Sequence, residues 1–259
     1  MTEEQKVNSR VDFSLPEKLD CHLADRRKTA FTLAEVLITL GIIGIVAAMT
    51  MPVILNKIDD RANINKLRRE YSLFQQAFQQ IAAENDLEFK NGISHCAGLS
   101  GVERNTCLKD VFKPKLKIIA DCDTNSGTNL SKCFVPQAET KQLNGKPAGY
   151  YYFNGNLTSG LLLEDGSSVA IHLDSADCNI LLNRCGFIVI DVNGPKRKPN
   201  TWGKDLFLFF VFSNKIVPAD GNNIDNGCYG QDDECEGYKD NCGTGSNYGT
   251  TCASKYLYK

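Results

Sequence analysis

The chain has 259 residues and a formal net charge of −2, and 42% of its residues are hydrophobic. This length can hold one large domain or two small ones, and the near-neutral charge argues against a broad electrostatic attraction to nucleic acid. Of the 11 cysteines, only Cys21 precedes the long apolar segment. We expect the cysteines beyond it to form disulfides in an oxidising compartment, with reduced thiols of a cytosolic protein as the alternative. They are Cys96, Cys107, Cys122, Cys133, Cys178, Cys185, Cys228, Cys235, Cys242 and Cys252.

The apolar segment covers residues 31–51 and reads FTLAEVLITLGIIGIVAAMTM. About 20 such residues in a helix span roughly 30 Å, the thickness of the hydrocarbon core of a bilayer. Arg26, Arg27 and Lys28 stand directly before it. Under the positive-inside rule, this arrangement predicts a single membrane-spanning helix with a cytoplasmic N-terminus and the rest of the chain outside.

Glu35 lies one turn inside this apolar segment, with no basic residue beside it in the segment. A carboxylate at the centre of a bilayer costs roughly 2.5–3.5 kcal/mol on insertion scales, so it should have a partner or a purpose. The alternative is that Glu35 lies near the headgroups and extends its carboxylate to water.

The stretch RRKTA/FTLAEVLITLGIIGIVAAMTMP resembles the processing and methylation motif of type IV pilins, type II secretion pseudopilins and competence pseudopilins. The resemblance implies that a prepilin peptidase cuts between Ala30 and Phe31, removes residues 1–30 as a leader and leaves a terminal amine that is methylated. It also implies that Glu35 pairs with this amine on a neighbouring subunit, and that Pro52 softens the helix in the filament. Two features differ from the usual pattern, because glycine usually stands where Ala30 is and the leader is long.

Beyond Pro52 the pattern becomes amphipathic over residues 52–85. Apolar residues recur at steps of three and four, which predicts one apolar stripe on a helix: Ile64, Leu67, Tyr71, Phe74, Phe78 and Ile81. Polar residues such as Lys66, Arg69 and Glu70 lie between them. We expect one helix from about Phe31 to about Asn85, with a kink at Pro52. It should pack on a sheet of its own domain, although a coiled-coil seam is the alternative.

Residues 86–145 show no sustained apolar periodicity and are predicted to be a loop-rich insertion. The spacings Cys96…Cys107 and Cys122…Cys133 make pairing between sequence neighbours our first expectation, although spacing alone does not determine connectivity.

Residues 146–217 contain a succession of short apolar runs that predicts an antiparallel meander. Asp165-Gly166 separates two of them and is typical of a tight hairpin turn. The last long run should be a central strand that is covered on both faces, one of them by the helix. The predicted strands are Tyr150–Phe153, Leu161–Leu163, Val169–Ile171, Phe187–Ile190, Leu206–Phe212 and Lys215–Val217. The expected fold is therefore α+β and pilin-like: a long N-terminal helix on an antiparallel sheet with disulfide-rich loops.

The segment between two of these strands, residues 191–205, resembles a loop near the end of many pseudopilin-like proteins. In type II secretion major pseudopilins, a loop in the equivalent part of the head binds calcium. Oxygen ligands from Asp191, Asn193 and Asp205 would suit such a hard cation. Turn and capping roles for these residues are the alternative.

The tail, residues 218–259, holds four cysteines but lacks apolar periodicity. We expect it to have no core of its own and to be ordered by two disulfides. Asp220, Asn222 and Asp225 form a second, weaker calcium candidate.

No motif for nucleophilic, phosphate-binding or dinucleotide chemistry occurs, so an enzyme is not expected. The resemblance implies a filament subunit of a type II secretion or type IV pilus-like machine. Its partners would be other pilin or pseudopilin subunits, the prepilin peptidase, an inner-membrane assembly platform and membrane lipid, and its head would be periplasmic or otherwise extracytoplasmic. The alternatives are a minor or competence-type pseudopilin that caps a fibre, and a membrane-anchored binding or adhesin module.

Overall fold

The computed structural model describes residues 31–122, 133–148, 159–179, 183–219, 242 and 249–258. The chain divides into two compact units, Met1–Thr50 and Met51–Lys259. The expected leader 1–30, with Ala30 and Cys21, lies outside the described residues, as do the predicted strand Tyr150–Phe153 and both Cys228 and Cys235.

Helix α1, Leu33–Ala83, is a single helix of 51 residues that contains Pro52. In the first unit its side chains are almost all exposed, including Leu37, Leu40 and Ile43. Among the described residues, α1 is the one helix long and apolar enough to cross a membrane, and none of its most apolar 18-residue stretch is buried. An exposed apolar surface of this length matches the hydrocarbon thickness of a bilayer.

In the second unit, α1 buries one stripe of side chains against the part of the chain that follows it, from residue 84 onward, which is called the head below. Leu67, Phe74, Phe78 and Ile81 of the predicted stripe are buried, and Tyr71 packs against the same core. Glu70, one of the polar residues between the stripe positions, is also buried, with only 1% of its surface exposed. Asp165, far away in sequence, lines the same cleft and is described below.

The head contains a six-stranded sheet of strand order β1-β2-β3-β4-β5-β6, in which every neighbouring pair is antiparallel. The predicted meander is confirmed over the described strands. Strand β1 was not predicted from the sequence, and its residues alternate between partly buried and exposed up to the buried Cys122. The strands are β1 Ile118–Cys122, β2 Ser159–Leu163, β3 Ser168–Leu173, β4 Arg184–Asp191, β5 Leu206–Phe212 and β6 Ile216–Pro218.

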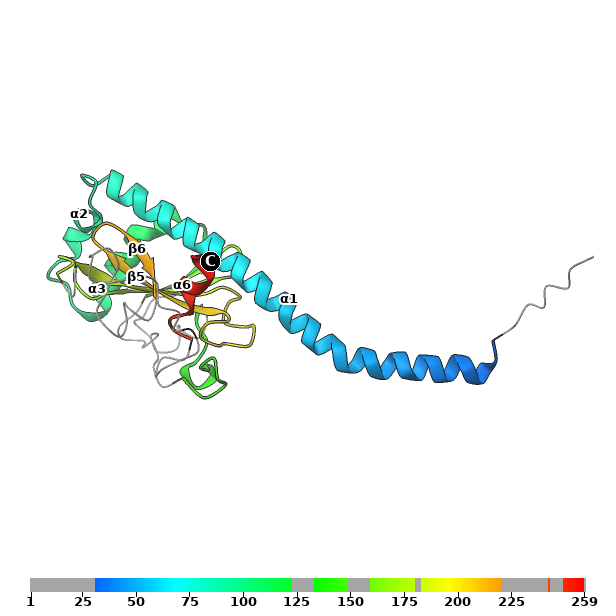
Figure 1. Ribbon diagram of the computed structural model, residues 1–259. Helices are drawn as coiled ribbons and strands as arrows, with labels where there is room; N and C mark the ends of the chain where they lie inside the picture. The colour runs from blue at the N-terminus through cyan, green and yellow to red at the C-terminus, as the bar shows by residue number, and fades with distance from the viewer. Residues whose placement is uncertain are drawn as a thin grey trace, which may run out of the picture. The chain divides into compact units, whose positions relative to one another are not determined.

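Strand β5 lies at the centre of two apolar clusters, and all of its residues are buried. Phe207, Phe209 and Val211 face the cluster that includes α1. Leu206, Leu208 and Phe210 alternate with them and join Trp202 and Phe134 in the cluster on the other face. Tyr71 of α1 stacks on Phe209 with ring centroids 5.5 Å apart, and Figure 1 shows this half of α1 running beside β5 and β6. The helix therefore covers one face of the sheet, as expected for an α+β fold.

The region predicted to be loop-rich contains α2, Phe89–Ile93, and α3, Gly101–Phe112, with the short 3₁₀ turns η1, Ser94–Cys96, and η2, Lys113–Lys115. Helix α3 was not predicted from the sequence, because its buried apolar residues are too few to form a sustained pattern. Leu108 and Phe112 lie one helical turn apart and are fully buried. Phe112 contacts Phe74 and Phe89, with ring centroids 5.9 Å and 5.6 Å away, so tertiary packing stabilises this helix.

Four cysteine pairs lie at disulfide distance in the described part of the chain. Cys96–Cys107 and Cys122–Cys133 have Cα atoms 5.8 Å and 6.2 Å apart. Cys178–Cys185 and Cys242–Cys252 have Cα atoms 4.0 Å and 4.5 Å apart. Each pair joins cysteines 7 to 11 positions apart in the sequence. The last pair holds α6, Cys252–Leu257, whose Ala253 belongs to the main core. A further 3₁₀ turn, η3, covers Gln137–Glu139.

Candidate functional site

The N-terminal end of α1 is capped by Thr32 and Glu35, which form hydrogen bonds with each other. Glu35 Oε2 accepts hydrogen bonds from the Thr32 amide and the Thr32 hydroxyl, both at 2.8 Å. The Glu35 amide in turn donates to Thr32 Oγ1 at 3.2 Å. This reciprocal arrangement is a capping box, with Thr32 as the N-cap and Glu35 at the third helical position. It satisfies N–H groups that the first turn of a helix otherwise leaves without partners.

The capping box places the Glu35 carboxylate close to Phe31, which is 85% exposed. A cut before Phe31 would create a terminal amine beside this carboxylate. The exposed residues that follow along the helix are large and apolar, among them Leu37, Leu40 and Ile42. The structure thus combines a hydrogen-bonded carboxylate with an apolar helical surface that is open for contacts with lipid or with other helices.

The loop after β4 brings together the three residues predicted to bind calcium. Asp191 Oδ1 accepts hydrogen bonds from the amides of Asn193 and Gly194, at 3.3 Å and 2.9 Å. Asp205 Oδ2 accepts one from the Asn193 side-chain amide at 3.2 Å and one from the Asn200 amide at 2.7 Å. Asp205 Oδ1 accepts one from the Thr201 amide. These bonds define the turn and capping roles of the two aspartates.

Several oxygens of this loop remain available as ligands. Asp191 Oδ2, Asn193 Oδ1 and Asn200 Oδ1 are buried and have no hydrogen-bond partner among the described residues. Burial raises the pKa of the Asp191 carboxyl well above its ordinary value, and the charge of Asp205 raises it further. Burial also raises the pKa of Asp205, although the amides of Thr201 and Asn200 oppose the shift. Buried carboxylate and amide oxygens without donors fit the chemistry of a hard cation such as Ca²⁺.

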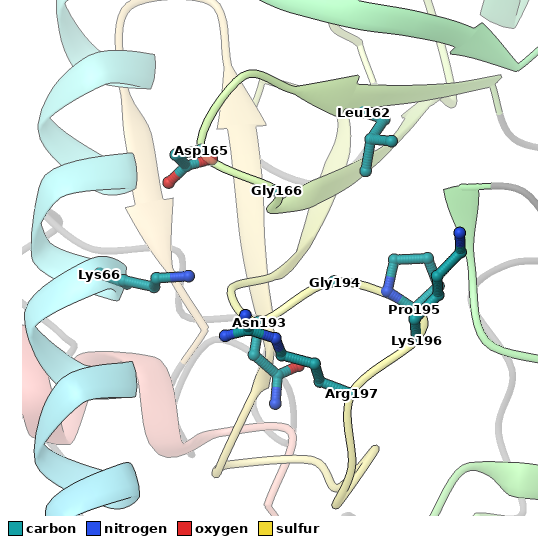
Figure 2. A pocket seen from close by; sticks show the side chains of 9 residues that line it. All are labelled: Lys66, Leu162, Asp165, Gly166, Asn193, Gly194, Pro195, Lys196 and Arg197. Carbon is teal, nitrogen blue, oxygen red and sulfur yellow. The ribbon is translucent and has the colours of Figure 1, made fainter.

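A pocket of about 230 Å³ lies beside this loop, between α1 and the β2–β3 turn. Figure 2 shows Lys66 pointing toward it from α1, with Asn193 and Arg197 below and Asp165 above. Lys66 Nζ donates to the carbonyl of Val192 at 3.1 Å. Gly166 and Gly194 bring the two turns close, because a side chain at Gly194 would meet the Gly166 carbonyl at 2.2 Å. The pocket mixes both signs of charge and contains no partnered nucleophile.

His172 lies in a cluster of charged and aromatic side chains between two strands. Its Nε2 lies 3.0 Å from Asp174 Oδ1, and Arg184 Nε lies 3.1 Å from the other oxygen of Asp174. His172 stacks on Phe187 with ring centroids 4.6 Å apart. These contacts join β3 to β4 beside the Cys178–Cys185 pair.

Comparison with known proteins gives one match. Residues 25–51 match the model of the prokaryotic N-terminal methylation motif. No curated protein and no solved structure matches the chain. The matched residues include the basic flank, Phe31 and Glu35, and they end before the head begins. The chain has an α+β, pilin-like architecture. At its N-terminus it carries the methylation motif that is the signature of prepilin-type proteins, the type IV pilins and pseudopilins.

Proposed function

We propose that this chain is a structural subunit of a type II secretion or type IV pilus-like filament, assembled after the prepilin peptidase has cut between Ala30 and Phe31. The observation that carries the proposal is the motif at residues 25–51 at the start of an exposed apolar helix that leads into a folded head. Its partners are other pilin-like subunits, the peptidase and an inner-membrane assembly platform.

Glu35 is the residue on which assembly depends in this proposal. Before assembly, its carboxylate is held by the amide and hydroxyl of Thr32, which reduces the cost of keeping it at the membrane. In the filament, the Phe31 amine of a neighbouring subunit pairs with it where little water is present, and the attraction between the charges is strong there. The exposed side chains of α1 then pack against neighbouring helices.

The charges before the apolar helix and the cysteines after it support a single membrane span with the head outside. Arg26, Arg27 and Lys28 directly before the apolar segment support a cytoplasmic N-terminus under the positive-inside rule. The head then lies outside the inner membrane, where paired cysteines such as Cys96 and Cys107 persist as disulfides.

Mass spectrometry of the mature N-terminus tests this function. We expect a chain that begins at methylated Phe31 in cells with an active prepilin peptidase, and an intact Met1 in cells that lack the enzyme. An intact Met1 in both strains, together with a monomeric protein, would contradict the filament and would favour a membrane-anchored binding or adhesin module. A processed chain found only at fibre tips would instead identify a minor, capping subunit.

We also propose that the loop of residues 191–205 binds calcium in the mature subunit. The buried oxygens of Asp191, Asn193 and Asn200 that accept no hydrogen bond support this assignment. An ion there would compensate the two buried carboxylates and fix the loop between β4 and β5.

A further inference from the structure

Glu70 is the one acidic residue of α1 that is buried, since Glu35, Asp59 and Asp60 are all exposed. It faces the β2–β3 turn, where Glu70 and Asp165 line the same cleft. The side chain of Asp165 is 11% exposed. Two carboxyl groups, one from the helix and one from the sheet, therefore meet where little water reaches them.

The oxygens at this contact lack donors. Glu70 Oε2 and Asp165 Oδ2 are buried without a hydrogen-bond partner in the described part of the chain. The other oxygen of Asp165 is already engaged, because Oδ1 accepts from the Ser167 amide at 3.0 Å and the Ser167 hydroxyl at 2.7 Å. A proton on Glu70 supplies the missing donor, since a carboxylic acid can donate to a carboxylate while two carboxylates cannot bond each other.

The charged groups around the pair do not replace this proton. On α1, Arg69 is 68% exposed, and its Nη1 lies 3.7 Å from Asp165 Oδ2. Lys66, one turn earlier, donates to the Val192 carbonyl. A cleft of about 450 Å³ beside the pair is lined by Lys115 and Lys117 after α3 and by Glu164 of the turn. Lys115 is paired with Glu84.

We propose that Glu70 and Asp165 form a pH-sensitive contact, which joins the β2–β3 turn to α1 while Glu70 is protonated and is lost when Glu70 ionises. It would link the strength of the helix–sheet packing in the head to the pH of its surroundings. The proposed function makes this contact relevant, because the head outside the inner membrane meets a pH that the cytoplasm does not buffer, but the contact itself does not depend on filament assembly.

The sign of the effect follows from the direction of the pKa shift. Burial raises the pKa of Glu70 from 4.5 to about 8, and the hydrogen bond and charge of Asp165 add to the shift, whereas Arg69 and Lys66 oppose it. A group whose pKa is raised on folding contributes stability that is fully present below the pKa of the unfolded chain. This stability is lost as the pH rises through the pKa of the folded chain. We therefore expect the head to lose stability between pH 4.5 and about 8.

Thermal unfolding of the full-length chain in detergent, measured from about pH 5 to about pH 9, tests the proposal. For the unchanged protein, the unfolding equilibrium constant should rise with pH, by up to about tenfold per pH unit. Glu70→Gln should make this rise less steep, because its amide donates to Asp165 at every pH. The rise that remains comes from Asp191 and Asp205, whose pKa values burial also raises. Glu164→Gln, which neutralises the exposed neighbour in the same turn, is the matched control and should keep it.

Identical pH profiles for Glu70→Gln and the unchanged protein would overturn the proposal. Should Glu70→Gln fail to fold, carbon-13 NMR of glutamate carboxyls in the unchanged protein provides the second measurement. One carboxyl should titrate near pH 8, and its absence would also overturn the proposal. The unfolding measurements are repeated with calcium and with a chelator. If the unfolding constant rises with pH only in the presence of the chelator, a bound cation and not a proton joins Glu70 to Asp165. If the N-terminus is not processed, the proposed filament function is contradicted, but the pH dependence of the contact between Glu70 and Asp165 is not affected.

Discussion

The two halves of α1 show how differently one helix can use its apolar residues. Up to about Met51, large apolar side chains cover every face and are exposed, for example Leu40 at 60% and Ile43 at 63%. From Asn63 onward, apolar residues form one buried stripe, in which Leu67 is 0% exposed and Phe74 is 1% exposed. A helix that is apolar all round needs lipid or other helices around it, whereas one with a stripe needs a single core. The first half is therefore suited to assembly and the second to folding of the head.

Each half also contains one carboxyl group in an apolar setting, and the two have different neighbours. Glu35 bonds Thr32 within its own first turn. Glu70 has no such local donor and meets Asp165 of the sheet. A local partner leaves Glu35 accessible to another molecule, while a partner across the core fixes Glu70 within the head.

The largest effect is expected at Glu35. Glu35→Ala should abolish filaments without changing the thermal unfolding of the head, because it removes the charge that pairs with the amine and touches nothing in the core. Glu35→Gln retains an acceptor for Thr32 but loses the charge, and it should also abolish filaments. Electron microscopy of sheared fibres measures both variants. Normal fibres from Glu35→Gln would assign the role of Glu35 to the capping box.

The second prediction compares equivalent substitutions in the two halves. Leu67→Ala should destabilise the head by about 2–5 kcal/mol, because it leaves a cavity in the core. Leu40→Ala is the matched control and should leave unfolding of the head unchanged, since this side chain is exposed. Denaturant unfolding in detergent, followed by tryptophan fluorescence of Trp202 in the core, measures both. Equal losses would show that the two halves do not differ in this way.

The third prediction concerns the cysteines that close the loop between α2 and α3. Replacing Cys96 and Cys107 together by serine should cost about 3 kcal/mol, because the unfolded chain regains the freedom that the cross-link removes. The measurement is denaturant unfolding with and without reductant. The double variant should have lost part of the response to reductant, and an unchanged stability would show that this pair is not bonded in solution.

The smallest effect is expected for calcium. At a free concentration of about 100 times Kd, a bound ion should stabilise the head by about 2.7 kcal/mol. Chelation should therefore lower the unfolding temperature of the unchanged protein, whereas Asp191→Asn should no longer respond. Asp110→Asn, on an exposed position of α3, serves as the control. A melting temperature that is the same with calcium and with a chelator would leave the loop with its turn and capping roles alone.

Much of the fold could be predicted because its patterns are local. The strand runs separated by Asp165-Gly166 and the apolar stripe that begins near Leu67 each repeat with the period of one element. Helix α3 and strand β1 were missed because their few apolar residues depend on distant partners. Phe112 is buried by Phe74 and Phe89, and Lys109 of α3 pairs with Asp121 of β1.

The sequence by itself determined the N-terminal signal, since Phe31, Glu35, the basic flank and the apolar run are consecutive and their chemistry needs no folded context. Only the tertiary structure decided the environment of Glu70 and of the loop after β4. Periodicity shows Glu70 only as a polar residue between the stripe positions, and Asp165 lies beside it once the β2–β3 hairpin packs on α1. In the same way, Asp191 and Asp205 become buried neighbours only when β4 and β5 pair. Burial and proximity between distant residues, which determine protonation and cation binding, are properties of the packed chain.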